Sequence, residues 1–85
     1  GLPETRRGAI PSFFDLYVDI PDHPGILGQV TTLLGIHKIS ITNLAILETR
    51  EDIMGVLRLT FRHEQDLLKA QKVLSDANFP VYRLD

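Results

Sequence analysis

The stretch 19–30, Asp-Ile-Pro-Asp-His-Pro-Gly-Ile-Leu-Gly-Gln-Val, constrains the fold of this chain most, because an alternating segment runs into it and an amphipathic segment runs out of it. Pro21 and Pro24 each fix φ and lack an N–H group, so neither extends a strand ladder or sits inside a helix. Pro24 does fit the first turn of a helix, with Asp22 or His23 before it in the capping region. We therefore expect a strand, a tight turn, and a helix that begins at Pro24.

A helix that begins there directs free backbone N–H groups, including that of Gly25, toward the end of the preceding strand. These donors and the positive end of the helix dipole suit an anionic group such as the carboxylate of an amino acid. Gly25 has no Cβ, so a ligand or another subunit would be able to approach the backbone closely. The same residues would also make a tight connection that binds nothing, and both interpretations stay open.

The rest of the chain alternates between strand-like and helix-like patterns. Residues 13–20 alternate as a strand whose core face would hold Phe14, Leu16, Val18 and Ile20. Residues 24–37 have the spacing of a helix with one buried stripe, made of Ile26, Leu27, Val30, Leu33 and Leu34. Residues 64–77 predict a second helix, which Asn78 would end in the left-handed conformation. A short strand at 81–84 completes the pattern.

Two further strands, 40–48 and 53–62, are joined by a short charged turn and predict a hairpin. Both faces of 40–48 carry apolar residues, and we place Leu44 and Ile46 on the face away from the core that holds Ile39, Ile41, Ala45 and Leu47. Because strand–helix–strand crossovers are right-handed, the order β-α-β-β-α-β predicts a ferredoxin-like α+β sandwich. Its antiparallel sheet has the order 4-1-3-2, with both helices on one face. The strand 40–48 then lies at an edge, where its apolar residues favour a dimer.

Composition excludes several classes of protein. The 85 residues carry a formal net charge of −2, without the basic excess typical of nucleic-acid binding. The absence of cysteine excludes disulfides and thiolate sites and agrees with a cytoplasmic location. No apolar run approaches the ~20 residues of a membrane span, so we expect no membrane contact. Residues 1–12 have no periodicity and read as a linker, and the first residue, Gly1, suggests a piece excised from a longer protein.

The residues do not predict catalysis or a metal site. His23, His37 and His63 lie on different predicted elements, and no histidine–carboxylate spacing indicates zinc. Asp22 and His23 are adjacent in sequence, so their side chains need not converge as a catalytic pair. The third strand lacks the aromatic residues of an RNA-recognition module. The chain therefore reads as a binding and association module.

The runs 22–27, Asp-His-Pro-Gly-Ile-Leu, and 39–43, Ile-Ser-Ile-Thr-Asn, resemble the ACT domain family. The resemblance covers 13–84 and implies a regulatory domain that binds an amino acid at an interface between domains. It places the ligand-contacting positions on Asp22, His23, Pro24, Gly25, Ile26, Leu27, Ser40, Thr42 and Asn43. Some serine-binding members carry asparagine at the positions of Asp22 and Ser40, which argues against serine here.

The runs 8–25 and 41–52 are similar, more specifically, to the C-terminal ACT domain in the prephenate dehydrogenase family of Gram-positive bacteria. This resemblance implies that 1–12 is a linker from a missing N-terminal, NAD-dependent catalytic domain and that 13–85 is the regulatory domain. It implies feedback by L-tyrosine, a homodimer through the edge strand, and neither activity nor a cofactor in this piece. The alternative is a structural dimerisation module without a ligand.

Overall fold

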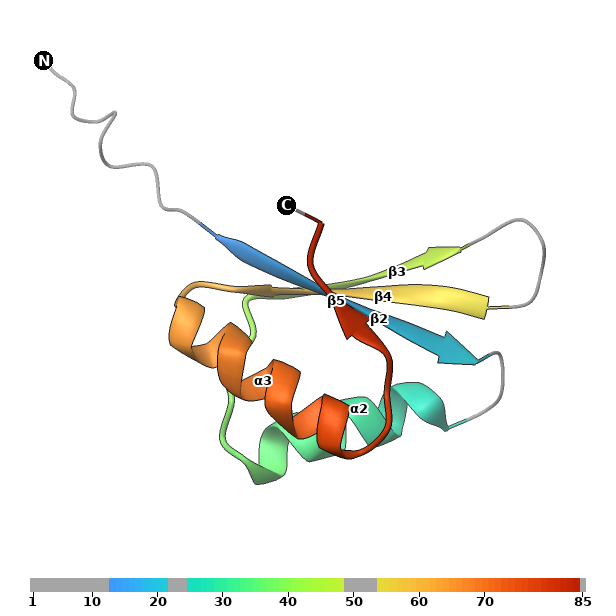
Figure 1. The fold of residues 1–85 in the computed structure, drawn as a ribbon, viewed down its shortest axis with the longest axis horizontal. Helices are drawn as coiled ribbons and strands as arrows, with labels where there is room; N and C mark the ends of the chain where they lie inside the picture. Colours follow the sequence, from blue (N-terminus) through green and yellow to red (C-terminus); the bar gives the residue numbers. More distant parts are fainter. Residues whose placement is uncertain (1–12, 22–24, 49–53, 85) are drawn as a thin grey trace, which may run out of the picture.

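The computed structural model describes residues 13–21, 25–48 and 54–84. The elements are, in chain order, β2 (Phe14–Pro21), α2 (Ile26–Ile36), β3 (Asn43–Glu48), β4 (Met54–Phe61), α3 (Glu64–Asp76) and β5 (Val81–Tyr82). The four strands form one antiparallel sheet in the order β3-β4-β2-β5, and both helices cover the same face of it (Figure 1). Read from the other edge, this is the predicted order 4-1-3-2, so the ferredoxin-like sandwich is confirmed.

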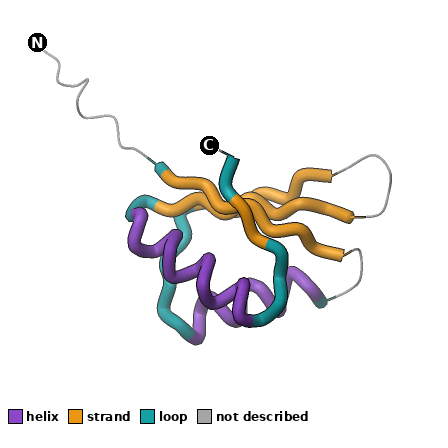
Figure 2. The backbone as a smooth tube through the Cα atoms, viewed as in Figure 1, coloured by secondary structure: helices purple, strands orange, loops and turns teal. Residues whose placement is uncertain are grey.

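The core lies between the sheet and the two helices, which form two separate layers in Figure 2. The predicted inward face of β2 is confirmed, because Leu16 and Val18 are fully buried and pair with the equally buried Leu59 and Leu57 of β4. The helices contribute one stripe each, Ile26, Val30 and Leu34 from α2 and Leu67, Ala70 and Leu74 from α3. Burying a large aliphatic side chain contributes about 1.5–3 kcal/mol, so these stripes fix how the helices lie on the sheet.

Two expectations about the edge strand were wrong. The strand begins at Asn43 rather than at residue 40, because residues 40–42 cross from the end of α2 to the sheet. Leu44 lies opposite Leu59 and Ile46 opposite Leu57, so both point to the core face and not away from it. Leu44 packs against the core, whereas Ile46 is 52% exposed at the edge. Both faces of this strand are apolar, and a period of two cannot tell which of two apolar faces is buried.

Both helices end in the same hydrogen-bonded motif. After α3, Asn78 has φ 71°, and the N–H of Phe79 donates to the carbonyl of Leu74 at 2.9 Å. The prediction that Asn78 ends this helix in the left-handed conformation is therefore confirmed. After α2, Lys38 takes the same place with φ 55°, and the N–H of the following residue, Ile39, reaches back into the helix in the same way. This is the Schellman motif, in which an apolar residue follows the left-handed one.

Candidate functional site

The first helix begins at Ile26, with Gly25 as its N-cap residue, and not at Pro24. Gly25 has φ 90° and ψ −13°, a left-handed conformation that interrupts helical geometry at that residue. Its carbonyl accepts the first helical hydrogen bond, from the N–H of Gln29 at 2.9 Å. No side chain caps this end within the described residues, and the first turn holds no acidic residue. None of the described side chains therefore occupies the N–H donors of the first turn, which suit an anionic ligand.

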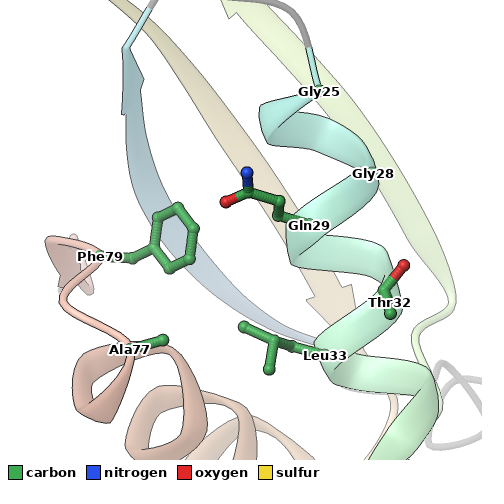
Figure 3. Close-up of a pocket in the computed structure, with 7 residues that line it drawn as sticks. All are labelled: Gly25, Gly28, Gln29, Thr32, Leu33, Ala77 and Phe79. Carbon is green, nitrogen blue, oxygen red and sulfur yellow. The ribbon is translucent and has the colours of Figure 1, made fainter.

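A groove opens beside this helix start, and Figure 3 shows the side chains around it. Its volume is about 530 Å³, and its lining comprises Gly25, Gly28, Gln29, Thr32 and Leu33 along α2 together with Ala77 and Phe79. The α2 residues recur every three or four positions, so they share one side of the helix. Gln29 and Leu33 point across the groove toward Phe79 and Ala77 (Figure 3).

The opposite wall is held in place by the end of α3. Phe79 follows the left-handed Asn78, and its N–H is bonded to Leu74, so its backbone is fixed to the helix. The next residue, Pro80, accepts a hydrogen bond at 3.0 Å from the N–H of Asp19 in β2. Phe79 also packs against the hydrophobic core. The aromatic wall is therefore anchored at both ends and does not depend on a ligand for its position.

The chemistry of the groove is that of an amphipathic ligand site. Leu33 and Phe79 supply apolar surface, whereas the amide of Gln29 and the hydroxyl of Thr32 supply hydrogen-bonding groups. None of the lining residues is charged, so charge recognition at this site falls to backbone donors at the helix start and to groups outside the groove. A small molecule with a ring and one anionic end fits this arrangement.

The structure brings only one of the described candidate residues into this groove, Gly25. Ile26 is 6% exposed and belongs to the core, and Leu27 packs against the core. Ser40, Thr42 and Asn43 are exposed at the other end of α2. Asp22, His23 and Pro24 lie outside the described residues.

The candidate residues near Asn43 lie far from Gly25 within one chain. Asn43 is paired with Thr60, which is paired with Asp15 at the start of β2, whereas Gly25 follows the other end of β2. Six residues of strand at about 3.4 Å each separate Asp15 from Pro21, which is roughly 20 Å. One amino acid does not bridge that distance. The residues near Asn43 would join a site at Gly25 only if they came from another chain.

Six of the groove residues were not predicted from the sequence, and the sequence pattern indicates only some of them. Gly28, Gln29, Thr32 and Leu33 follow from Gly25 by helical spacing, so a helix drawn through Gly25 would have found them. Ala77 and Phe79 lie far away in the sequence, and only the packing of α3 beside α2 brings them here.

The face of the sheet away from the helices carries two side-chain hydrogen bonds and a stacked pair of tyrosines. Thr60 donates a hydrogen bond to Asp15 at 2.7 Å, and Tyr82 donates one to Asp19 at 3.0 Å. The rings of Tyr17 and Tyr82 stack with their centroids 5.8 Å apart. Burial raises the pKa of Tyr82 above its ordinary value of 10.0, and the hydrogen bond to Asp19 adds to the shift.

Metal binding and membrane insertion are two other possible functions of a chain. Within the described ranges, no group of three or more His, Cys, Asp or Glu residues is placed to hold a metal ion. In the same part of the chain, neither helix has the length and apolar character needed to cross a bilayer.

Comparison with known proteins adds the family. The family model of the ACT domain matches residues 14–78, which is more than half of the chain. The chain belongs to the ACT domain family. The resemblance of the runs 22–27 and 39–43 to that family is thereby confirmed.

This ACT domain is similar to part of two curated prephenate dehydrogenases. It is 51% identical over 74 residues to that of Bacillus subtilis (strain 168) and 40% identical over 75 residues to that of Lactococcus lactis subsp. cremoris (strain MG1363). Each match covers 87% of this chain. The chain spans only 20% and 21% of the length of these two relatives.

Two solved structures share the fold. One is the crystal structure of the ACT domain of prephenate dehydrogenase tyrA from Bacillus anthracis, with a TM-score of 0.74 and 48% identity, covering 80% of this chain and 99% of that chain. The other is protein BT0572 from Bacteroides thetaiotaomicron, with a TM-score of 0.70 and 30% identity, covering 84% of this chain and 46% of that chain. The first match extends over nearly the whole length of that ACT domain chain.

Proposed function

We propose that this ACT domain is the regulatory domain of a prephenate dehydrogenase and that it binds L-tyrosine as a feedback ligand. The observation that carries the proposal is the groove at the start of α2, where backbone donors meet an aromatic wall. The similarity to prephenate dehydrogenases supports the choice of pathway. The volume of about 530 Å³ lies within the range of roughly 300–1,000 Å³ that is usual for small-molecule sites.

The ligand would lie along the groove with its carboxylate on the N–H groups that follow Gly25. Its ring would rest against Phe79 and Leu33, where an aromatic pair contributes about 0.5–1.5 kcal/mol beyond the buried area. Its ammonium group would find the carboxylate of Asp22 or backbone carbonyls of an edge strand. Gly25 holds the N-cap position of α2, and we propose a ligand contact as the role of the Asp22 charge.

The proposal extends to the longer protein. Catalysis and NAD binding would belong to a domain N-terminal to this chain, joined through residues 1–12, in the cytoplasm. The ACT domain itself would have no activity and no cofactor, and it would contact neither nucleic acid nor membrane. Its contribution is to change the activity of the attached enzyme when tyrosine binds.

A homodimer through β3 is part of the same proposal. This strand pairs only with β4 in the described sheet, and Ile46 and Leu47 are 52% and 37% exposed beside its outer edge. If two copies of β3 paired antiparallel about their centres, Asn43 of one copy would lie opposite Glu48 of the other. That arrangement would move the candidate residues near Asn43 toward the groove end of the second chain. A monomer in sedimentation at tens of micromolar would contradict it, since a standard interface holds at such concentrations.

Isothermal titration of the domain with the twenty amino acids tests the ligand. Heat for L-tyrosine is the expected result, and silence across the whole panel would favour the alternative, a dimerisation module without a ligand. The variant Gln29→Glu sharpens the test, because a carboxylate near the helix start favours the helix but repels the ligand's carboxylate. We expect an unchanged or higher Tm together with at least a tenfold loss of affinity for tyrosine.

The matched control is Thr31→Glu, which adds the same charge to the same helix outside the groove lining. It should leave tyrosine affinity within about twofold of the parent's.

A second variant, Asp22→Ala, would remove a charge-assisted hydrogen bond to the ammonium group. Such bonds contribute about 1.5–3 kcal/mol, which corresponds to a loss of roughly ten- to a hundredfold in affinity. If Asp22→Ala lowered Tm but left inhibition by tyrosine unchanged, the residue would have a structural role instead.

A further inference from the structure

The two neighbouring threonines of α2 differ in what their hydroxyl groups contact. The hydroxyl of Thr31 donates back into the helix, to the carbonyls of Leu27 at 3.0 Å and Gly28 at 3.2 Å. Threonine on a helix commonly bonds a carbonyl three or four residues earlier in this way. The hydroxyl of Thr32 makes no hydrogen bond to any residue that the structure describes. A ligand is therefore able to use both its donor and its acceptor.

Thr32 also lies where a ligand in the groove would meet it. Thr32 lines the groove, whereas Thr31 is not among the lining residues. Figure 3 shows the hydroxyl oxygen of Thr32 directed along the helix toward Gly28. Gly25, Gly28 and Thr32 recur at intervals of three and four residues, so they form a line along one side of α2. A Cβ added at Gly28 would meet none of the described atoms within 4 Å, so the space above this residue is open.

The distance from Gly25 to Thr32 suits the length of tyrosine. The seven residues between them correspond to about 10 Å along the helix axis. An extended tyrosine spans about 8 Å from its carboxyl carbon to its phenol oxygen, given C–C bonds of about 1.5 Å. A hydrogen bond at the phenol end adds about 2.8 Å. A tyrosine whose carboxylate lies at the start of the helix therefore brings its phenol hydroxyl within reach of Thr32.

Gln29 is the other lining residue whose side chain forms hydrogen bonds. It follows Gly25 by four residues, or about 6 Å of helix, and its amide points across the groove toward Phe79 (Figure 3). It is therefore placed beside the carboxylate end and the ring of the ligand. This leaves Thr32 as the lining side chain that is able to distinguish a phenol from a phenyl ring.

We propose that Thr32 determines the specificity of the groove and that its hydroxyl forms a hydrogen bond with the phenol hydroxyl of L-tyrosine. The inference rests on the proposed function, because it concerns how the same groove distinguishes tyrosine from phenylalanine. The two amino acids present the same carboxylate, ammonium group and ring to the other lining residues. A neutral hydrogen bond makes a modest net contribution, so we expect tyrosine to bind about three- to tenfold more tightly than phenylalanine.

The variant Thr32→Val tests this role. Valine keeps the branched shape of threonine and a similar helix propensity but forms no side-chain hydrogen bond. Isothermal titration of the 85-residue chain with L-tyrosine and with L-phenylalanine measures both affinities. Thr32→Val should lower the affinity for tyrosine to within about twofold of that for phenylalanine and leave the affinity for phenylalanine unchanged. Thr32→Ser retains a hydroxyl and should retain the preference for tyrosine.

Two control variants separate this role from a general effect on the helix. Thr31→Val makes the same change one residue earlier, outside the groove lining, and should keep the preference of the parent chain. Gln29→Glu acts on the carboxylate that both ligands carry, so it should weaken both by similar factors. A variant that only disturbed the helix would likewise weaken both ligands, whereas the ratio of the two affinities reports on the phenol contact alone.

The possible outcomes distinguish this inference from the proposed function. An undiminished preference for tyrosine in Thr32→Val would overturn the role of Thr32 and leave the proposed function standing. Equal affinities of the parent chain for tyrosine and phenylalanine would have the same consequence. An absence of heat from both amino acids with the parent chain would overturn the proposed function and, with it, the role of Thr32.

Discussion

The left-handed conformation of Gly25 predicts opposite effects for the same substitution at two neighbouring glycines. Gly25 has φ 90° at the N-cap of α2, whereas Gly28 lies inside the helix without a positive φ. Among the described residues, an added Cβ meets no atom within 4 Å at either position, so crowding by them does not contribute to the difference. The backbone conformation alone distinguishes Gly25→Ala from Gly28→Ala.

The magnitudes follow from backbone energetics. An L-residue in the left-handed region costs about 1–2 kcal/mol, and alanine recovers about 0.5 kcal/mol by restricting the unfolded chain. Gly25→Ala should therefore lower the free energy of unfolding by about 1 kcal/mol. Gly28→Ala should raise it by about 0.5–1 kcal/mol, as expected for alanine in a helix. The gap of about 2 kcal/mol corresponds to roughly 10 °C in Tm for a domain of this size.

Urea unfolding followed by circular dichroism measures both variants against the parent, and thermal scans provide a second reading. Shifts of the same sign for Gly25→Ala and Gly28→Ala would refute the reasoning, because they would mean that φ at Gly25 does not control the energy. If close approach of a ligand were the only reason for glycine at this position, Gly25→Val would damage ligand response more than folding. The positive φ revises that expectation, since any L-residue here strains the fold as well as the site.

Three further predictions concern the fold. Leu67→Ala should lower the free energy of unfolding by about 2–5 kcal/mol, because Leu67 is 0% exposed on α3. Leu68→Ala should lower it by no more than about 0.5 kcal/mol, because the neighbouring Leu68 is 50% exposed. Chemical denaturation of both variants measures the difference. Lys38→Gly should stabilise the domain by up to about 1 kcal/mol, since φ is 55° there, and a lower Tm would contradict it. The pKa of Tyr82 is raised in the folded state, so its protonated hydroxyl stabilises the fold fully below pH 10, and this stabilisation is lost as pH rises through the folded-state pKa. In Tyr82→Phe, the urea midpoint should therefore fall less steeply with pH above about pH 9 than it does in the parent.

The fold was predictable because the strand β2 and the two helices each have a one-sided apolar pattern. The stripe of α3 and the alternation of β2 each define a single apolar face, and the right-handed crossover rule then leaves one topology. The edge strand β3 fails this condition, since Leu44 and Leu47 occupy opposite faces and only the register with β4 assigns Leu44 to the core. Register depends on pairing across the sheet, which a local pattern does not contain.

The residues of the candidate site were predictable only where a single stretch of sequence determines their position. Gly25 was found because a glycine after a proline at a helix start has a local signature. The positive φ of Gly25 was not predicted, because the sequence allowed a helix that begins at Pro24, two residues before the observed start at Ile26. Phe79 was not predicted as a groove residue for a different reason. Its place in the groove results from the helix ending at Asn78 and from α3 packing beside α2. That information is tertiary and has no counterpart in the segment around Gly25.

The separation of the candidate residues links ligand binding to association. Gly25 and Asn43 are at opposite ends of the sheet, so a ligand that uses both must use two chains. By thermodynamic linkage, an assembly that raises the affinity for tyrosine by some factor is itself favoured by tyrosine by the same factor. A tyrosine affinity that is independent of protein concentration would therefore exclude the shared site and leave the groove of a single chain as the whole site.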